Sequence, residues 1–281
     1  GNESQEIVTS PGLVVGIVID QMRYDYLYRF WNKYSNDGFK RLVNDGFVFS
    51  NANFNYVPTY TAPGHACIYT GTTPAYNGII SNEWYDRYLK KTIYCVGDST
   101  VMPVGTTSIS GKMSPRNLLS TTVTDELKLA TNMSSKVIGI SLKDRGAILP
   151  AGHSANAAYW HDPYTNNWIS STFYMTKLPG WVIDFNKRKM SDSLLSKKWT
   201  TLLPIEQYTE STADDNSYEG LFKGEDKPVF PHDLPALKDT NSELIRETPF
   251  GNTFTKEFVL EAIKNENLGK AKATDFLTIS F

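Results

Sequence analysis

The sequence predicts an α/β fold in which a largely parallel sheet is flanked by helices. Two runs of apolar, mostly β-branched residues, at positions 13–19 and 136–142, have the length and composition of strands buried on both faces. Segments with apolar residues at helical spacing lie at positions 24–34 and 39–43. Since strands that alternate with helices tend to pair in parallel, this order favours an α/β architecture.

The remaining elements follow from the same patterns. A helix is expected from Thr61 to residue 70, because Pro63 falls in its first turn and Gly71 follows its end. Further helices are expected at residues 124–130 and 257–265, and further strands at residues 47–49, 157–160 and 275–281. The strand at residues 47–49 is expected to pair in parallel with the first.

One long segment departs from this alternation. Residues 187–253 are polar and rich in turn-forming residues, which is typical of a loop-rich cap or insertion. The chain is therefore expected to consist of the N-terminal part of an α/β core (1–186), the insertion (187–253) and a return to the core (254–281) that leaves the core incomplete.

The composition excludes several classes of protein. The 281 residues carry 28 Lys and Arg against 30 Asp and Glu, so no surplus of positive charge is available for a nucleic-acid backbone. No apolar run approaches the ~20 residues of a membrane-spanning helix. The two cysteines are too few for a zinc ribbon and leave one disulfide possible.

Two side chains are expected at the carboxyl edge of the sheet, where α/β folds bind ligands. Asp20 follows the first strand, and Thr61 begins a helix. Taken singly, such an aspartate is typical of a turn and such a threonine of a helix cap.

The surrounding segment gives them a different meaning. Residues 58–65 are Pro-Thr-Tyr-Thr-Ala-Pro-Gly-His, and Asn82 lies 21 positions after Thr61. This segment closely resembles the nucleophile segment of the alkaline phosphatase superfamily, and in particular bacterial alkaline phosphatases with a threonine nucleophile. Those enzymes are related to type I phosphodiesterases and nucleotide pyrophosphatases. The resemblance implies that Thr61 is the nucleophile, that Asn82 contacts a phosphoryl oxygen, and that Asp20 holds the zinc ion that also binds Thr61.

A third match points to one branch of the superfamily. Lys143 and Arg145 follow a predicted strand, in a Lys-Asp-Arg sequence similar to the Lys-x-Arg with which the monoesterase branch binds non-bridging phosphate oxygens. Without the resemblance they are ordinary solvated loop charges. A monoester carries one more negative charge than a diester, so two cations beside the site favour monoesters.

The resemblance implies zinc-dependent hydrolysis of small phosphate monoesters through a phospho-threonine intermediate, assisted by two zinc ions, in a periplasmic or otherwise extracytoplasmic enzyme. Threonine is a suitable nucleophile only when its alkoxide is stabilised, which a zinc pair can do. A nucleotide pyrophosphatase or phosphodiesterase of the same superfamily, or a non-catalytic ligand-binding module, are the alternatives. Leaving group, oligomeric state and cysteine redox state stay open.

The resemblance breaks at the end of the chain. Family members supply further zinc ligands, including an Asp with a His four residues later, beyond the strand that ends here at Phe281. Asp20 and Thr61 alone cannot fill a tetrahedral site. The chain is therefore expected to be a fragment of a longer enzyme, inactive as it stands, that binds zinc weakly or not at all.

Overall fold

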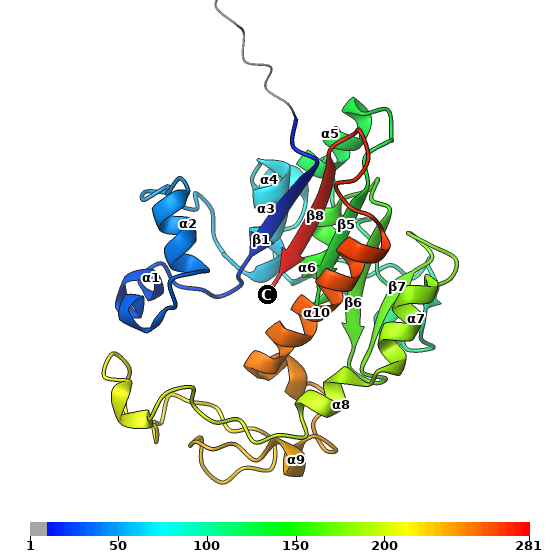
Figure 1. The fold of residues 1–281 in the computed structure, drawn as a ribbon. Helices are drawn as coiled ribbons and strands as arrows, with labels where there is room; N and C mark the ends of the chain where they lie inside the picture. The colour runs from blue at the N-terminus through cyan, green and yellow to red at the C-terminus, as the bar shows by residue number, and fades with distance from the viewer. Residues whose placement is uncertain (1–9) are drawn as a thin grey trace, which may run out of the picture.

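The computed structural model describes residues 10–281, built around a six-stranded sheet in the order β1-β8-β5-β6-β7-β4 (Figure 1). The first four strands of that order are parallel to their neighbours, and the last two continue the sheet in antiparallel fashion. The strands are β1 (Leu13–Val18), β4 (Pro103–Val104), β5 (Val137–Ser141), β6 (Ala157–Asp162), β7 (Asn167–Ser171) and β8 (Asp275–Ser280). The predicted α/β fold with a largely parallel sheet is confirmed.

Helices cover both faces of the sheet. Figure 1 shows α10 (Pro249–Asn265) in front of it and α3 (Thr61–Thr70) and α6 (Asp144–Ala151) behind it. Side chains of β6 alternate between two cores: Trp160 packs with α3 and α6, and Tyr159 packs with α10. In the α10 core the rings of Trp168 and Phe258 stack with centroids 4.2 Å apart.

The first strand is exposed where the sequence predicts burial. Val15 and Ile17 on β1 are 44% and 54% exposed, because β1 is the outermost strand of the sheet. Its parallel partner is β8, the last strand of the chain. The strand predicted at residues 47–49 does not form, and Phe47 is 83% exposed. The prediction of a parallel pair between these two early segments is therefore wrong.

The helices predicted at residues 39–43, 61–70, 124–130 and 257–265 form, all but the second with shifted bounds, whereas residues 24–34 form two short segments and not one helix. The helix predicted from Thr61 is α3, which ends at Gly71 in the left-handed conformation (φ 66°). Thr122 caps α5 (Val123–Ala130) through a capping box with Asp125. The helix predicted at residues 257–265 begins earlier, at Pro249. The other helical segments of the N-terminal part are α1 (Tyr26–Arg29), η1 (Trp31–Lys33), α2 (Phe39–Asp45), α4 (Pro74–Asn77), η2 (Ile109–Gly111), α5 (Val123–Ala130) and α7 (Gly180–Lys187).

Two segments lie outside the main sheet. A hairpin of β2 (Glu83–Asp86) and β3 (Lys91–Tyr94) forms a separate two-stranded sheet. Residues 187–253 contain α8 (Met190–Leu194), η3 (Ile205–Gln207), α9 (Leu234–Leu237) and η4 (Leu244–Glu247), and run below the sheet in Figure 1. The three-part division of the chain stays a prediction. Over residues 10–281, no helix combines the length and hydropathy needed to cross a bilayer.

Candidate active site

Asp20 and Thr61 meet at the carboxyl edge of the parallel strands. Asp20 follows β1, and its backbone N–H donates to the carbonyl of Phe281 at 2.9 Å, which ties together the ends of β1 and β8. Thr61 is the first residue of α3, and its hydroxyl donates to Asp20 Oδ2 at 2.9 Å. Both residues are half-buried. The predicted nucleophile and the predicted ligand are therefore in direct contact.

His65 anchors the helix below Thr61. Its Nδ1 lies 2.7 Å from the Thr61 carbonyl oxygen and its Nε2 lies 2.8 Å from Ser280 Oγ. The side chain is buried, and burial lowers its pKa, so the neutral ring donates to the carbonyl through Nδ1 and accepts from Ser280 through Nε2. Both ring nitrogens are used to fix α3 against the end of β8.

Asn82 lies at the N-terminus of the same helix. Its Oδ1 accepts a hydrogen bond from the backbone N–H of Ala62 at 2.9 Å. An asparagine that accepts through Oδ1 keeps Nδ2 as a donor. The Asn82 amide therefore lies at the positive end of the α3 dipole, an arrangement that can stabilise an anion.

Lys143 and Arg145 are at the N-terminus of α6, directly after β5. Lys143 is its N-cap residue, and Arg145 is in its first turn. Lys143 Nζ lies 3.6 Å from Glu243 Oε2, and Arg145 Nη1 donates to the hydroxyl of Tyr94 at 3.0 Å. Burial and the positive charge of Arg246 lower the pKa of Lys143, against the opposing effect of Glu243.

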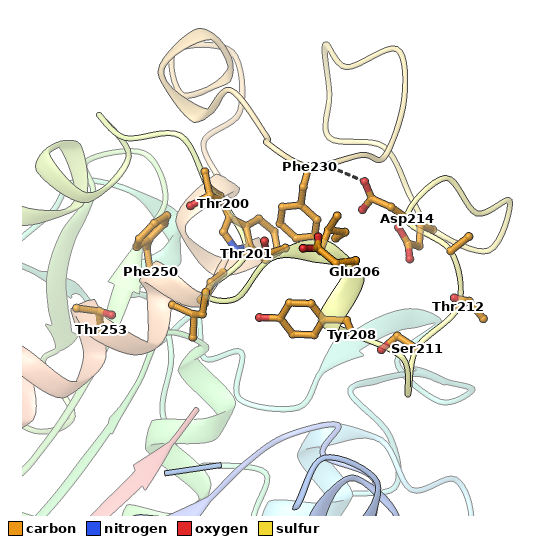
Figure 2. Close-up of a pocket in the computed structure, with 16 residues that line it drawn as sticks. Thr200, Thr201, Glu206, Tyr208, Ser211, Thr212, Asp214, Phe230, Phe250 and Thr253 are labelled. Atoms are coloured by element: carbon orange, nitrogen blue, oxygen red, sulfur yellow. Dashed lines mark hydrogen bonds between the residues drawn. The ribbon is translucent and has the colours of Figure 1, made fainter. Parts of the chain in front are cut away.

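A cavity of about 240 Å³ is lined by some of the predicted site residues. Asp20, Thr61 and Lys143 line it together with Arg246 and Asn252, whereas Asn82 and Arg145 are not among its lining residues. A second cavity, of about 870 Å³, lies between residues 199–230 and the start of α10, and its lining includes none of the predicted site residues. Figure 2 shows Tyr208, Phe230 and Phe250 around that second cavity.

Three residues near the site were not found from the sequence. Arg246 lines the smaller cavity, and its Nη1 donates to Glu243 at 2.6 Å, so one carboxylate holds both Arg246 and Lys143. Glu243 and Arg246 are three positions apart, a spacing that predicts a contact between them. No sequence pattern relates either residue to Lys143. Tyr94, at the end of β3, has no distinguishing sequence signal at all.

Asp20 and Thr61, the residues expected to hold a metal, offer it two oxygen atoms 2.9 Å apart. Two oxygen ligands of one tetrahedral zinc ion, each ~2.0 Å from it, lie roughly 3.3 Å apart, which is close to the separation of the Asp20 and Thr61 oxygens. Within residues 10–281, however, no group of three or more His, Cys, Asp and Glu side chains could hold a metal. The described chain does not complete a tetrahedral site by itself.

The largely parallel sheet with helices on both faces is an alkaline-phosphatase-like α/β fold, as its close match to a solved alkaline phosphatase shows. Residues 14–281 match the family model described as type I phosphodiesterase / nucleotide pyrophosphatase. The chain belongs to that family.

Several named proteins are similar to this chain. It is 54% identical over 98% of its length to alkaline phosphatase PhoV of Synechococcus elongatus, and 51% identical over its full length to alkaline phosphatase PafA of Elizabethkingia meningoseptica. The crystal structure of wild-type PafA has a TM-score of 0.95 with 52% identity, covering 97% of this chain and 53% of that one. A solved PafA variant with one threonine, one asparagine, one lysine and one arginine substituted is equally similar in fold, with a TM-score of 0.95 and 50% identity.

The similarity covers only part of the length of these relatives. The chain covers 50% of PhoV and 52% of PafA, so it spans about half the length of these relatives.

Proposed function

We propose that the full-length protein to which this chain corresponds hydrolyses phosphate monoesters through a covalent intermediate on Thr61. The observation that carries the proposal is the hydrogen bond from the Thr61 hydroxyl to Asp20 Oδ2, at the N-terminus of α3 and in the cavity that Lys143 lines. The names of the similar proteins PhoV and PafA support the same activity.

The chain's own residues account for the nucleophilic half of the reaction. Thr61 Oγ1 forms a bond to phosphorus, and the bond between phosphorus and the alcohol oxygen breaks. The proton that Thr61 must lose has an acceptor 2.9 Å away, in Asp20 Oδ2. The leaving alcohol oxygen takes up that proton. Water then forms a bond to phosphorus as the bond from Thr61 Oγ1 to phosphorus breaks, so that inorganic phosphate leaves and a proton of the water restores the Thr61 hydroxyl. The α3 N-terminus and Asn82 bind the negative charge of the phosphoryl group.

Two zinc ions are part of this proposal for the full-length protein, in which they would stabilise the threonine alkoxide and the leaving oxygen. In this chain Asp20 and Thr61 are the residues expected to hold one of them. The extracytoplasmic location is likewise a proposal, to be tested by fractionating cells that express the full-length protein.

The cations near the site favour monoesters over diesters. Lys143, Arg145 and Arg246 all lie at or beside the site. Glu243 pairs with Lys143 and Arg246, and Arg145 is joined to Asp144 through the Tyr94 hydroxyl. These three cationic side chains can donate to the oxygens of a dianionic phosphoryl group. In the PafA variant, the substituted threonine and asparagine are 21 positions apart and the lysine and arginine are two apart, the spacings of Thr61 to Asn82 and of Lys143 to Arg145.

The test compares monoester and diester hydrolysis in the full-length enzyme. Thr61→Ala is expected to lower kcat/KM for p-nitrophenyl phosphate by at least ~10³ and to abolish trapping of a phosphorylated peptide that contains Thr61. Lys143→Ala with Arg145→Ala is expected to lower monoester kcat/KM by ~10² more than diester kcat/KM. Equal losses for the two substrates would favour the phosphodiesterase alternative, which the family description names. Full activity of Thr61→Ala would refute a threonine intermediate.

A further inference from the structure

Tyr94 lies between a carboxylate and a guanidinium at the N-terminus of α6. Its hydroxyl donates to Asp144 Oδ1 at 2.6 Å and accepts from Arg145 Nη1 at 3.0 Å. Asp144 Oδ1 also accepts from the backbone N–H of Arg145 at 2.6 Å. One phenol therefore connects two neighbouring side chains of opposite charge.

This arrangement leaves most N–H donors of the Arg145 guanidinium without a hydrogen bond to the described part of the protein. A direct pair of Arg145 with Asp144 would consume two of the guanidinium donors in parallel hydrogen bonds. The phenol takes only Nη1, and Arg145 Nε has no hydrogen-bond partner within residues 10–281 although it is buried. A buried donor without an acceptor is costly, so it favours an incoming acceptor such as a phosphoryl oxygen.

The hairpin that carries Tyr94 also carries Asn82. Asn82 directly precedes β2, and its carbonyl accepts from the backbone N–H of Cys95 at 2.9 Å, next to the Glu83–Tyr94 pair of the ladder. Asn117 Nδ2 donates to the carbonyls of Tyr94 and Cys95 at 3.3 and 3.2 Å and so fixes this end of the hairpin. The base of one short hairpin thus sets the positions of both the Asn82 amide and the Tyr94 hydroxyl.

We propose that Tyr94 is a positioning residue for Arg145, and that the base of the β2–β3 hairpin holds Arg145 and Asn82 in a fixed relation around one phosphoryl group. The proposal rests on the proposed function, since it assigns Tyr94 to the binding of a monoester phosphoryl group through Arg145. Tyr94 acts on the substrate only through Arg145.

The phenol keeps its role in alkaline solution. Burial, together with the negative charge of Asp144, raises the pKa of Tyr94 well above its usual value, while Arg145 opposes that rise. Tyr94 therefore stays protonated, donating to Asp144 and accepting from Arg145, at pH values where an exposed tyrosine ionises.

The experiment is a double-mutant cycle in the full-length enzyme. Tyr94→Phe removes one oxygen atom and preserves the ring, and it is expected to lower kcat/KM for p-nitrophenyl phosphate about tenfold while leaving bis-p-nitrophenyl phosphate hydrolysis within about twofold. In an Arg145→Ala background, the same change is expected to have no further effect. Tyr85→Phe on β2, where the side chain is 62% exposed, is the matched control and is expected to equal the parent.

The outcomes separate the two proposals. If Arg145→Ala reduces monoester hydrolysis selectively but Tyr94→Phe equals the parent, or if Tyr94→Phe costs as much in the Arg145→Ala background as alone, the positioning role is wrong and the proposed function stands. If Arg145→Ala affects both substrates equally, the monoester assignment itself fails. A fall in thermal midpoint of Tyr94→Phe, together with equal losses on both substrates, would show a structural role and overturn the inference.

Discussion

Substitution of Gly139 by alanine tests how tightly α6 packs on the central strand β5. A Cβ at this position would lie 2.2 Å from the carbonyl oxygen of Ala147, 2.8 Å from Ala151 Cβ and 3.1 Å from Thr278 Oγ1. Two of these atoms belong to α6, and a backbone carbonyl cannot rotate away as a flexible side chain can. Relief requires α6 to move off the sheet by roughly 1 Å, and strained overpacking of a core costs about 1–3 kcal/mol or more.

We therefore expect Gly139→Ala to lower the free energy of unfolding by at least about 3 kcal/mol, at the upper end of that range because the contacts involve backbone. Urea denaturation followed by tryptophan fluorescence measures it. Gly180→Ala is the matched control: Gly180 is exposed at the start of α7, has no atom within 4 Å of the added Cβ, and is expected to change stability by less than about 0.5 kcal/mol. A loss below about 1 kcal/mol for Gly139→Ala, with an unchanged m-value, would refute the packing argument.

Three further results are expected for the 281-residue chain. The hydrogen bond to Asp125 raises the pKa of His153. Burial of Asp125 acts to raise the pKa of its carboxyl, but the hydrogen bonds that it accepts, including the one from His153, lower that pKa overall. The stabilisation from His153 is therefore complete below its unfolded pKa of ~6.5 and lost as pH rises through its folded pKa, whereas that from Asp125 is lost as pH falls below ~3.8. In urea titrations His153→Gln should flatten the alkaline side of the stability curve, and an unchanged curve would contradict this. Equilibrium dialysis should find less than one tightly held zinc ion per chain, since Asp20 and Thr61 give only two ligands, and stoichiometric binding lost in Asp20→Ala would disprove it. Because β1 is an edge strand and Ile17 is 54% exposed, we expect the chain to self-associate. Sedimentation velocity should show less self-association for Ile17→Lys than for the parent chain. A monomeric parent at the same concentration would contradict this expectation.

The sequence predicts the local elements better than their places in the sheet. β1 and β5 have nearly the same composition, and both are predicted as buried, yet β5 is buried throughout and β1 is an edge. The difference arises because β5 lies between β8 and β6, whereas within residues 10–281 β1 pairs with β8 alone, a strand more than a hundred residues away from either. No pattern within a strand encodes which strand will lie beside it.

In the candidate site too, some contacts can be predicted from the sequence and others cannot. The contact of Asp20 with Thr61 follows from the rule that the ends of parallel strands share one edge, and the structure has it at 2.9 Å. The contacts of Tyr94 with Arg145 and of Glu243 with Lys143 join segments about 50 and 100 residues apart, through ordinary polar side chains. Such contacts depend on tertiary packing and leave no periodic trace in the sequence.

The place of β8 between β1 and β5 also constrains how the chain can fold. Leu13 pairs with Asp275, so the paired residues of that ladder are 262 positions apart in the chain. At a synthesis rate of roughly 5–20 residues per second, β1 waits on the order of tens of seconds before its partner exists. Pairings of such long range are also slow to form, because the whole intervening loop must be closed first. During that interval the apolar segment of β1 lacks its partner strand, so it is a segment at which two nascent chains can pair.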